Sequence, residues 1–426
     1  MIINVQDIAA STLEKMQSVG FDNAQVSVSV SEQDELNISN NEPSLLRSTE
    51  DYALSLTGMV DGRKAGAALT DLDGDAIAFN VNDLYQRALL APQDEANAVS
   101  SGESARFEQG PQFCDLDLLA KKVEELLAFR KSETPKMAID EGAASHQLTQ
   151  EHILTSGGSS LSCSVGRYEL SAFGTATDGE HSSSFNYAGG ATNDLSLVHA
   201  SEYFGIGDML RDTQNQIKTF PIDKKFTGAV ILAPTAVTDL LSWLLGQIGD
   251  MALISGGSVF KDSVGSLIAS PMLNICSRFD APGHATYSND AFRTPPIKLV
   301  SEGKLGMLLP SFYGSKKTST THTPAGSGWS VSPGKTSRAA LIANTGKGAL
   351  VTRLSMGSPG ANGDFSGVIK NSFIIKDGEV GPALSESMIT GNMAEMLKDI
   401  DGLSEEHLDL GSMDLPWIRI PNLHFS

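Results

Sequence analysis

Histidine, glutamate and cysteine are the residue types that hold a catalytic zinc ion, and their spacing in this chain does not form a zinc-binding motif. Such a site needs about three protein ligands and one open position for water. No two of the eight histidines are four or five residues apart, so no pair has the spacing of a zinc peptidase helix. The eight are His146, His152, His181, His199, His284, His322, His407 and His424. The sequence predicts no catalytic zinc in this chain, unless histidines distant in sequence build a site together.

The strongest structural signal lies in residues 228–250, which would form a platform for such a site. Residues 228–233 are a short apolar run with the length of a buried strand, and Pro234 and Thr235 are typical of a strand end and a helix cap. The apolar residues that follow recur at helical spacing and predict a mostly buried helix. They are Val237, Leu240, Leu241, Leu244, Leu245 and Ile248.

This segment resembles the TldD/PmbA family, described as peptide-maturation metalloproteases or modulators of DNA gyrase. TldD-type members carry His-Glu-x-x-x-His within Leu-Leu-His-Glu-x-x-Gly-His, and residues 240–247 here read Leu-Leu-Ser-Trp-Leu-Leu-Gly-Gln. The resemblance places Ser242, Trp243 and Gln247 at the metal-site positions. Serine and glutamine are poor zinc ligands, and tryptophan cannot act as a general base. The family's third ligand, a cysteine near the C-terminus, has no counterpart, because the last cysteine is Cys276.

The resemblance extends in order along nearly the whole chain. Residues 363–366 resemble the family's Gly-Asp-Phe-Ser segment, and residues 389–393 resemble its following turn into a helix. The PmbA type, also called TldE, lacks the zinc motif and pairs with a TldD chain, and this sequence resembles that type. Two departures, a less acidic stretch at 279–283 and no Arg after Ser366, are consistent with a divergent branch that has its own partner or dimerises with itself.

The resemblance implies a PmbA/TldE-like non-zinc subunit of a TldD/TldE-type metalloprotease complex, which handles unfolded peptides while a TldD-like partner holds the zinc. An extended peptide is best held by adding a strand to a sheet edge. We place a possible peptide path along Gly256, Gly257, Gly363, Asp364, Phe365 and Ser366. Two alternatives stay open: a stand-alone non-catalytic peptide-binding homodimer, and a protease that uses unrecognised residues. The substrate peptide and its cleavage site also stay open.

The amino-acid composition limits which binding partners and which cellular location are expected. There are 31 basic and 51 acidic residues, a net charge of −20, so direct binding of nucleic acid is not expected. The three cysteines, Cys114, Cys163 and Cys276, are far apart and predict reduced thiols in a cytoplasmic protein. The N-terminus lacks the pattern of a signal peptide, and no apolar run reaches the roughly 20 residues that cross a membrane.

A chain of 426 residues predicts two domains, and the pattern of elements predicts an α+β fold with mixed or antiparallel sheets and flanking helices. We expect an N-terminal α+β domain over residues 1–222, with two subdomains at roughly 1–95 and 115–222. A β-rich C-terminal domain over residues 226–426 would contain the degenerate metal-site helix.

Local patterns predict the elements of the first half. We expect helices at 5–19, 82–90 and 116–129, and paired strands at 24–30 and 35–39. A hairpin over 54–69 would turn at Asp61–Gly62. The acidic residues 71–75 are interpreted as a turn between two strands rather than a calcium loop, residues 92–112 as a loose surface segment, and residues 159–186 as short strands. That group of short strands would be a structural meander or a face covered by another chain.

In the second half, residues 296–309 predict a hairpin with its turn at Glu302–Gly303. Residues 314–348 are rich in Gly, Ser, Thr and Lys, so they predict a long mobile loop, either solvated or beside the peptide path.

Overall fold

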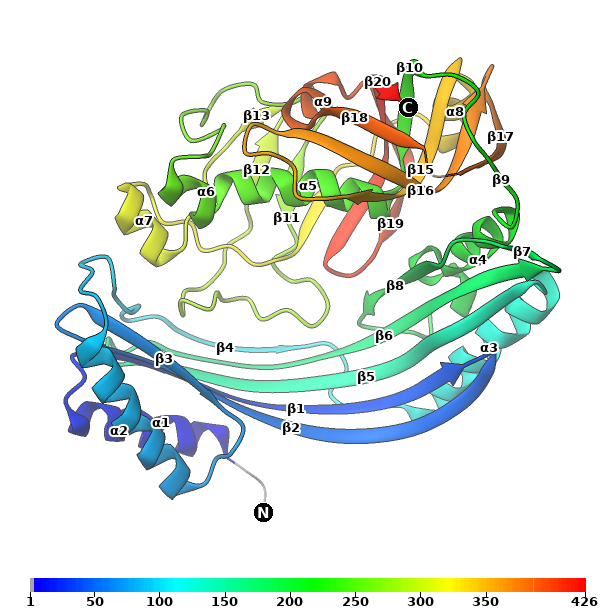
Figure 1. The fold of residues 1–426 in the computed structure, drawn as a ribbon. Coiled ribbons are helices and arrows are strands. Elements are labelled where there is room, and N and C mark those ends of the chain that lie inside the picture. Colours follow the sequence, from blue (N-terminus) through cyan, green and yellow to red (C-terminus); the bar gives the residue numbers. More distant parts are fainter. Residues whose placement is uncertain (1–3, 386) are drawn as a thin grey trace.

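A computed structural model describes residues 4–385 and 387–426 of the chain, and these residues form two sheets with helices packed on them (Figure 1). The first sheet has eight strands in the order β3-β2-β1-β5-β6-β4, with β7 and β8 both paired to β6. Its strands are β1 (Asn23–Ser39), β2 (Glu42–Val60), β3 (Arg63–Leu69), β4 (Ser104–Gln109), β5 (Met137–Thr155), β6 (Ser160–Asp178), β7 (His181–Ser182) and β8 (Asn186–Thr192).

The first sheet is bowed, and its two faces have different neighbours (Figure 1). The convex face carries α1 (Val5–Val19) and α2 (Gly74–Leu90) at one end, and α3 (Leu116–Glu133) at the other. Because side chains alternate along a strand, Val26 and Val28 of β1 point to these helices and are fully buried. The concave face looks toward the second sheet. The short helix η1 (Ala200–Gly205) and α4 (Ile206–Asn215) lead from the first sheet to the second.

The second sheet has twelve strands, with the path β13-β12-β11-β14-β20-β10-β15-β16-β17-β9 and with β18 and β19 attached beside it. It is mixed, because β10 runs parallel to β15 and antiparallel to β20. Its strands are β9 (Thr219–Phe220), β10 (Phe226–Leu232), β11 (Ile275–Ser277), β12 (Lys298–Ser301), β13 (Lys304–Leu305), β14 (Trp329–Val331), β15 (Lys347–Met356), β16 (Asp364–Lys376), β17 (Glu379–Leu384), β18 (Met388–Asn392), β19 (Gly402–Asp409) and β20 (Met413–Phe425). The predicted α+β fold class with mixed sheets is therefore confirmed, while the predicted domain boundaries stay a prediction.

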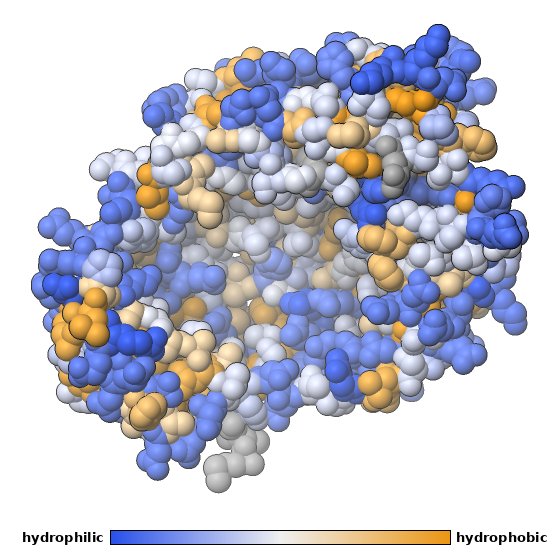
Figure 2. Space-filling view, in the orientation of Figure 1, coloured by the Kyte–Doolittle hydropathy of each residue, from blue (hydrophilic) through white to orange (hydrophobic). Residues whose placement is uncertain are grey.

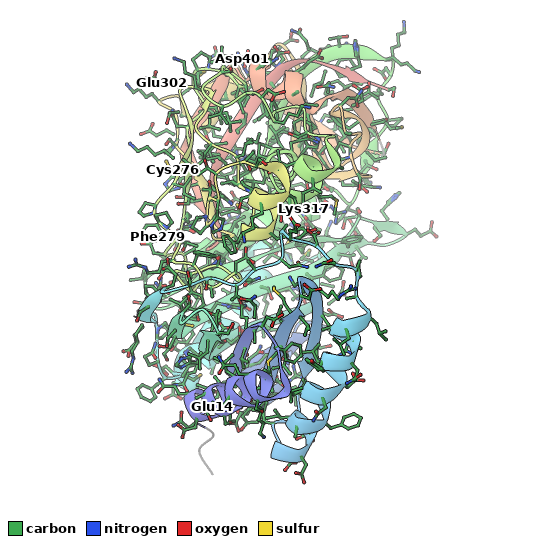
Figure 3. The ribbon with its side chains drawn as sticks, turned by 90° about the vertical axis from the view of Figure 1, so that its left-hand side faces the viewer. Glu14, Cys276, Phe279, Glu302, Lys317 and Asp401 are labelled. Carbon is green, nitrogen blue, oxygen red and sulfur yellow. The ribbon has the colours of Figure 1, made fainter. Side chains whose placement is uncertain are left out.

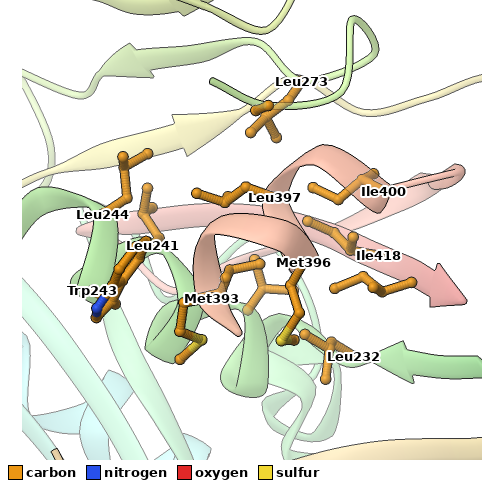
Figure 4. Packing of buried hydrophobic residues seen from close by; sticks show 14 of the residues in the cluster. Leu232, Leu241, Trp243, Leu244, Leu273, Met393, Met396, Leu397, Ile400 and Ile418 are labelled. Atoms are coloured by element: carbon orange, nitrogen blue, oxygen red, sulfur yellow. The ribbon is translucent and has the colours of Figure 1, made fainter. Parts of the chain in front are cut away.

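The strand and helix predicted from residues 228–250 are present as β10 and α5 (Pro234–Ile248). The predicted cap is wrong. The N-cap is Ala233, which makes no side-chain cap bond, and the Thr235 hydroxyl instead donates to the carbonyl of Thr352 at 2.6 Å. The apolar side of α5 packs in the core of the second region, where Leu241 and Leu244 are buried (Figure 4). Four shorter helices complete this region: α6 (Asp250–Ser255), α7 (Phe312–Thr318), α8 (Arg338–Ala343) and α9 (Met393–Asp399).

Polar contacts join the two sheet regions. Near α7, the Tyr313 hydroxyl donates to Asp94 at 2.8 Å, and Lys317 forms an ion pair with the same carboxylate at 3.0 Å (Figure 3). Farther along, the Tyr287 hydroxyl donates to Glu151 of β5 at 2.8 Å. Residues 314–348 are therefore not one mobile loop, since they contain most of α7 together with β14 and α8 and help to hold the two regions together.

Three predictions that rested on local signals are confirmed. The first helix ends at Gly20, whose φ of 113° is easily adopted only by glycine. The hairpin of β2 and β3 turns at Asp61 and Gly62, which both have positive φ. The turn at Glu302–Gly303 likewise joins β12 to β13.

Strand lengths were predicted wrongly. Residues 24–30 and 35–39 belong to the single strand β1, which pairs with β2 on one side and β5 on the other. The segment 92–112 contains β4, which pairs with β6. The short strands expected at 159–186 are mainly the long strand β6, whose face is covered in part by Tyr287 and Ala291 of the same chain.

The start of the second helix was also predicted wrongly. Helix α2 begins at Gly74, because the Asp73 side chain accepts hydrogen bonds from the amides of Asp75 and Ala76. The acidic residues 71–75 therefore lie between a strand and a helix rather than between two strands. In the described part of the chain, no helix is both long and apolar enough to cross a membrane.

Candidate functional site

A cleft separates the concave face of the first sheet from α5, and Figure 2 shows it as a hollow between the two regions. It consists of two cavities of about 610 Å³ and 630 Å³. Both cavities are lined by Ala143, Ser171, Gly189, Thr238 and Leu410, so they form one continuous space. Small side chains on the floor would let the backbone of a ligand come close to the sheet.

Helix α5 supplies a polar stripe to the roof of this cleft. Thr235, Thr238 and Asp239 lie three and four residues apart, so they share one side of the helix, and all three line the first cavity. Burial raises the pKa of Asp239 to about 6 from an ordinary value of 3.8. This carboxyl can therefore change its protonation state in mildly acidic solution.

Strand β15 supplies a cation to the same cavity. The Arg353 guanidinium lies 4.2 Å from the centre of the Phe185 ring and 5.9 Å from that of Tyr187. Its Nε atom is buried and has no hydrogen-bond partner among the described residues, and burial lowers the pKa of Arg353. Because Nε is buried, a ligand in the cavity cannot reach it directly, but Arg353 lines the cavity and its positive charge can attract a ligand carbonyl or carboxylate.

Strand β8 offers a sheet edge at the cleft. Within residues 4–385 and 387–426 its only strand partner is β6, and residues 186–189 line the first cavity. The edge is free only in part, because the Tyr187 amide donates to Asn186 Oδ1 and the Ala191 amide donates to the Leu410 carbonyl. An extended peptide can bond to such an edge through its own backbone.

The second cavity has a polar lining that comes from the concave face of β1, β5 and β6. Gln33, Glu35 and Ser145 contribute, together with Arg167 and Glu169, whose side chains form an ion pair at 2.6 Å. His284 lies in the wall, and burial is the main cause that lowers its pKa. The cleft therefore has small residues on its floor, side chains of both charges in its walls, and a strand edge that is free in part.

The structure does not bring the predicted metal-site positions together on one side of α5. Ser242 is exposed, whereas Gln247 is buried and its Oε1 accepts a hydrogen bond from the Val259 amide at 3.0 Å. Neither side chain is a good zinc ligand, and Gln247 is already engaged by the Val259 amide.

Trp243 lies in the apolar core rather than in the cleft (Figure 4). It is 8% exposed and meets the ring of Phe260 edge to face, with centroids 5.8 Å apart. A Cβ atom added to Gly363 would lie 3.0 Å from its Cζ2 atom, so Gly363 packs directly on the indole. The indole Nε1 is buried without a hydrogen-bond partner in the described part of the chain.

The residues predicted along a peptide path do not line the two cavities. Gly363 has a φ of 92°, and the next residues are the start of β16 rather than a turn. The amides of Asn392 and Asn362 donate to Asp364 at 2.9 Å and 2.7 Å and lower its pKa. Phe365 is buried in the core and Ser366 is exposed.

The glycine pair that follows α6 is close to α5 but is also outside the cavities. Gly256 ends α6 with a φ of 73°, and Gly257 donates its N–H to the Ser255 hydroxyl. Both glycines are exposed, and the segment is linked to α5 through the bond between Gln247 and Val259.

The residues that do line the cleft were missed, although α5 carried a signal. Three polar residues, Thr235, Thr238 and Asp239, interrupt an otherwise apolar helix at i, i+3 and i+4. That spacing marks a polar side on a helix that is largely buried. The sequence signal for Arg353 was weaker, since it is only a charged residue that follows the apolar residues of β15.

Comparisons with known proteins agree on one family. Residues 226–426 match the family model described as the PmbA/TldA metallopeptidase C-terminal domain. Metalloprotease PmbA of Escherichia coli O157:H7 is 25% identical over 97% of this chain and 95% of its own length. A metalloprotease PmbA homolog of Haemophilus influenzae is 27% identical over 40% of this chain and 42% of its own length.

Solved structures show the same fold. TldE from Thermococcus kodakarensis has a TM-score of 0.83 at 20% identity, covering 98% of this chain and all of its own. A candidate modulator of DNA gyrase from Bacteroides thetaiotaomicron VPI-5482 has a TM-score of 0.84 at 20% identity, with both chains covered in full. The predicted resemblance to the TldD/PmbA family is confirmed.

Proposed function

We propose, on the premise that residues 226–426 are a PmbA/TldA metallopeptidase C-terminal domain, that this chain is a non-zinc, TldE-like subunit that holds unfolded peptides. A TldD-like partner would supply the zinc and the general base for cleavage. The observation that best supports this proposal concerns α5. Its polar stripe of Thr235, Thr238 and Asp239 faces an open cleft, whereas the metal-site positions are exposed (Ser242), packed in the core (Trp243) or bonded to a backbone amide (Gln247). We also propose a cytoplasmic location, which suits three free thiols.

The cleft supports a role in binding an extended peptide. A backbone can add to the part of the β8 edge that is free, the small residues of the floor leave room for it, and the charge of Arg353 can attract a carbonyl or terminal carboxylate. The lining combines small residues with large apolar ones such as Phe173, Phe204 and Leu410, so recognition would use the peptide backbone together with apolar contacts.

The test is to purify the chain alone, a TldD-like chain alone, and the two together, and to measure cleavage of a fluorescent unfolded peptide. We expect chelator-sensitive cleavage that is much faster for the mixture than for either chain alone. Chelator-sensitive cleavage by this chain alone, with zinc bound at α5, would overturn the proposal.

A cleft variant makes the test specific to this chain. Thr238→Trp would fill the space where the two cavities meet, and we expect at least about a tenfold loss of peptide binding, or about 1.4 kcal/mol. Ser132→Trp, on the exposed surface of α3, is the matched control and should bind as the unchanged chain does. Equal binding by both variants would place the peptide elsewhere.

The alternative function is a stand-alone peptide-binding homodimer. It would be favoured if the chain alone dimerises and binds peptide through the same cleft, and if adding a TldD-like chain produces neither a complex nor cleavage. Light scattering of the purified chain and of the mixture separates these outcomes.

A further inference from the structure

Three side chains of different types meet on the convex face of the first sheet, away from the cleft. They are Asp34 of β1, Cys114 just before α3, and His146 of β5, and one ligand atom from each lies within 4.8 Å of the other two. Asp34 and His146 are register partners across the β1–β5 ladder, so their Cβ atoms are neighbours. The chain entering α3 then brings Cys114 beside this pair.

The imidazole of His146 is held in an orientation that leaves one nitrogen with a free lone pair. Its Nε2 lies 2.9 Å from the carbonyl oxygen of Pro111. A carbonyl only accepts, so Nε2 carries the hydrogen and Nδ1 is left as an acceptor. The ring packs against Tyr168 with centroids 5.0 Å apart and is 3% exposed. Histidines that bind metals commonly donate their other N–H to a backbone carbonyl in this way.

The other two side chains are also positioned by neighbours. The Ser48 hydroxyl donates to Oδ1 of Asp34 at 2.5 Å, so the carboxylate is oriented and its second oxygen can serve a ligand. The Cys114 thiol is partly buried beside Asp34. A metal ion binds cysteine as the thiolate, so binding would release the thiol proton.

We propose that Asp34, Cys114 and His146 form a binding site for a divalent transition-metal ion, with zinc the best match. Sulfur, nitrogen and oxygen ligands together suit zinc and its substitute cobalt. Ligand atoms around a tetrahedral zinc lie roughly 3.3–3.8 Å apart, given bond lengths of about 2.0–2.3 Å, so a contraction of about 1 Å would close the site. Asp34 and Cys114 are partly exposed, which leaves a fourth position for water.

This site is independent of the peptide cleft. Because side chains alternate along a strand, Gln33, Glu35 and Ser145 line the cleft while their neighbours Asp34 and His146 point to the other face. A bound ion would tie the segment before α3 to β1 and β5. Its role would be to fasten this part of the first sheet region, without any part in the chemistry at α5.

Cobalt titration of the metal-free chain tests the proposal. We expect saturable binding of one cobalt ion per chain, with visible d–d bands and a thiolate charge-transfer band in the near ultraviolet. Cys114→Ser should lose the charge-transfer band, whereas Cys163→Ser, which removes a buried thiol elsewhere in the chain, should keep it. An unchanged band in Cys114→Ser, or the absence of saturable binding, would refute the site.

Two further variants guard against a simple folding defect. His146→Gln should weaken zinc binding by more than tenfold in calorimetry, and Ser48→Ala should weaken it by about tenfold while the cobalt spectrum keeps its shape, because Ser48 only positions Asp34. Circular dichroism of each metal-free variant checks the fold. Zinc should raise the melting temperature of the unchanged chain and not that of Cys114→Ser.

The outcomes are distinct from those for the proposed function. If the Cys114→Ser substitution abolishes zinc binding, the result supports this site and is compatible with an α5 that binds no zinc. Zinc that remains bound at full occupancy in that variant would contradict this site.

Discussion

The two halves of α5 differ in what they face, although they belong to one continuous helix. The first half presents Thr238 and Asp239 to an open cleft. The second half, where the family's zinc motif would lie, buries Trp243 in the core and uses Gln247 to hold the Val259 amide. The comparison teaches that a cleft-facing polar surface and a packed position equivalent to the family's zinc motif can lie about one helical turn apart. The proposed role of a peptide-holding subunit follows from this difference.

The largest loss of stability is expected for a substitution in the packed half of α5. Trp243→Ala would leave a cavity beside Phe260 and Gly363, so we expect a loss of about 3–5 kcal/mol in the free energy of unfolding. Urea denaturation measures it. Phe79→Ala, at an aromatic residue that is 73% exposed, should stay within about 0.5 kcal/mol. A small loss for Trp243→Ala would mean that this half of the helix is not tightly packed.

A smaller effect is expected for the glycine that packs on Trp243. Gly363→Ala would place a methyl group 3.0 Å from the indole on a backbone with a φ of 92°, and should cost about 1–3 kcal/mol. Gly326→Ala, where a methyl group would meet open space, is the control. Equal unfolding midpoints for the two variants would argue against the contact between Gly363 and α5.

The half of α5 that faces the cleft should make the stability of the protein depend on pH through Asp239. The folded state raises the pKa of Asp239 to about 6 from 3.8, so it binds this proton more tightly than the unfolded chain does. Its contribution to stability is therefore present below about pH 4 and is lost as the pH rises through about 6. Asp239→Asn lacks this loss and should be more stable than the unchanged chain above pH 6 by about 1–2 kcal/mol, after allowance for solvent that reaches the carboxyl.

The measurement is the unfolding free energy of both proteins from pH 4 to pH 8. Burial also raises the pKa of Asp212 to about 6, but this residue is common to both proteins and cancels in the difference. A constant difference across this range would show that Asp239 is not buried as described.

The smallest effect concerns the exposed glycine between the two metal-site positions. A methyl group on Gly246 meets nothing within 4 Å, and the residue is inside a helix. Gly246→Ala should therefore stabilise the protein by about 0.5–1 kcal/mol, measured by denaturation. Destabilisation would indicate that this side of α5 is covered.

Local signals in the sequence predicted the elements that local interactions determine. Gly20 ends the first helix, Asp61–Gly62 forms a hairpin turn, and the apolar spacing after Pro234 gives α5. Segments whose structure depends on distant partners were missed. Strand β1 is continuous because β5 pairs along it, and α8 is held by contacts such as that of Arg338 with Trp417.

The same distinction applies to the candidate sites. The polar side of α5 was present in the sequence as three residues at helical spacing, but what it faces depends on how the two sheets meet. Asp34, Cys114 and His146 are far apart in sequence; the register of β1 with β5 pairs Asp34 with His146, and the chain that enters α3 adds Cys114. No spacing rule could have joined them.

The most direct test of the central claim is anomalous diffraction at the zinc edge from crystals of this chain soaked in zinc. The account predicts no peak beside Ser242 and Gln247, because one side chain is exposed and the other is buried in a bond to Val259. A peak at Asp34, Cys114 and His146 would belong to the separate site. A strong peak between Ser242 and Gln247, with a bound water, would contradict the account.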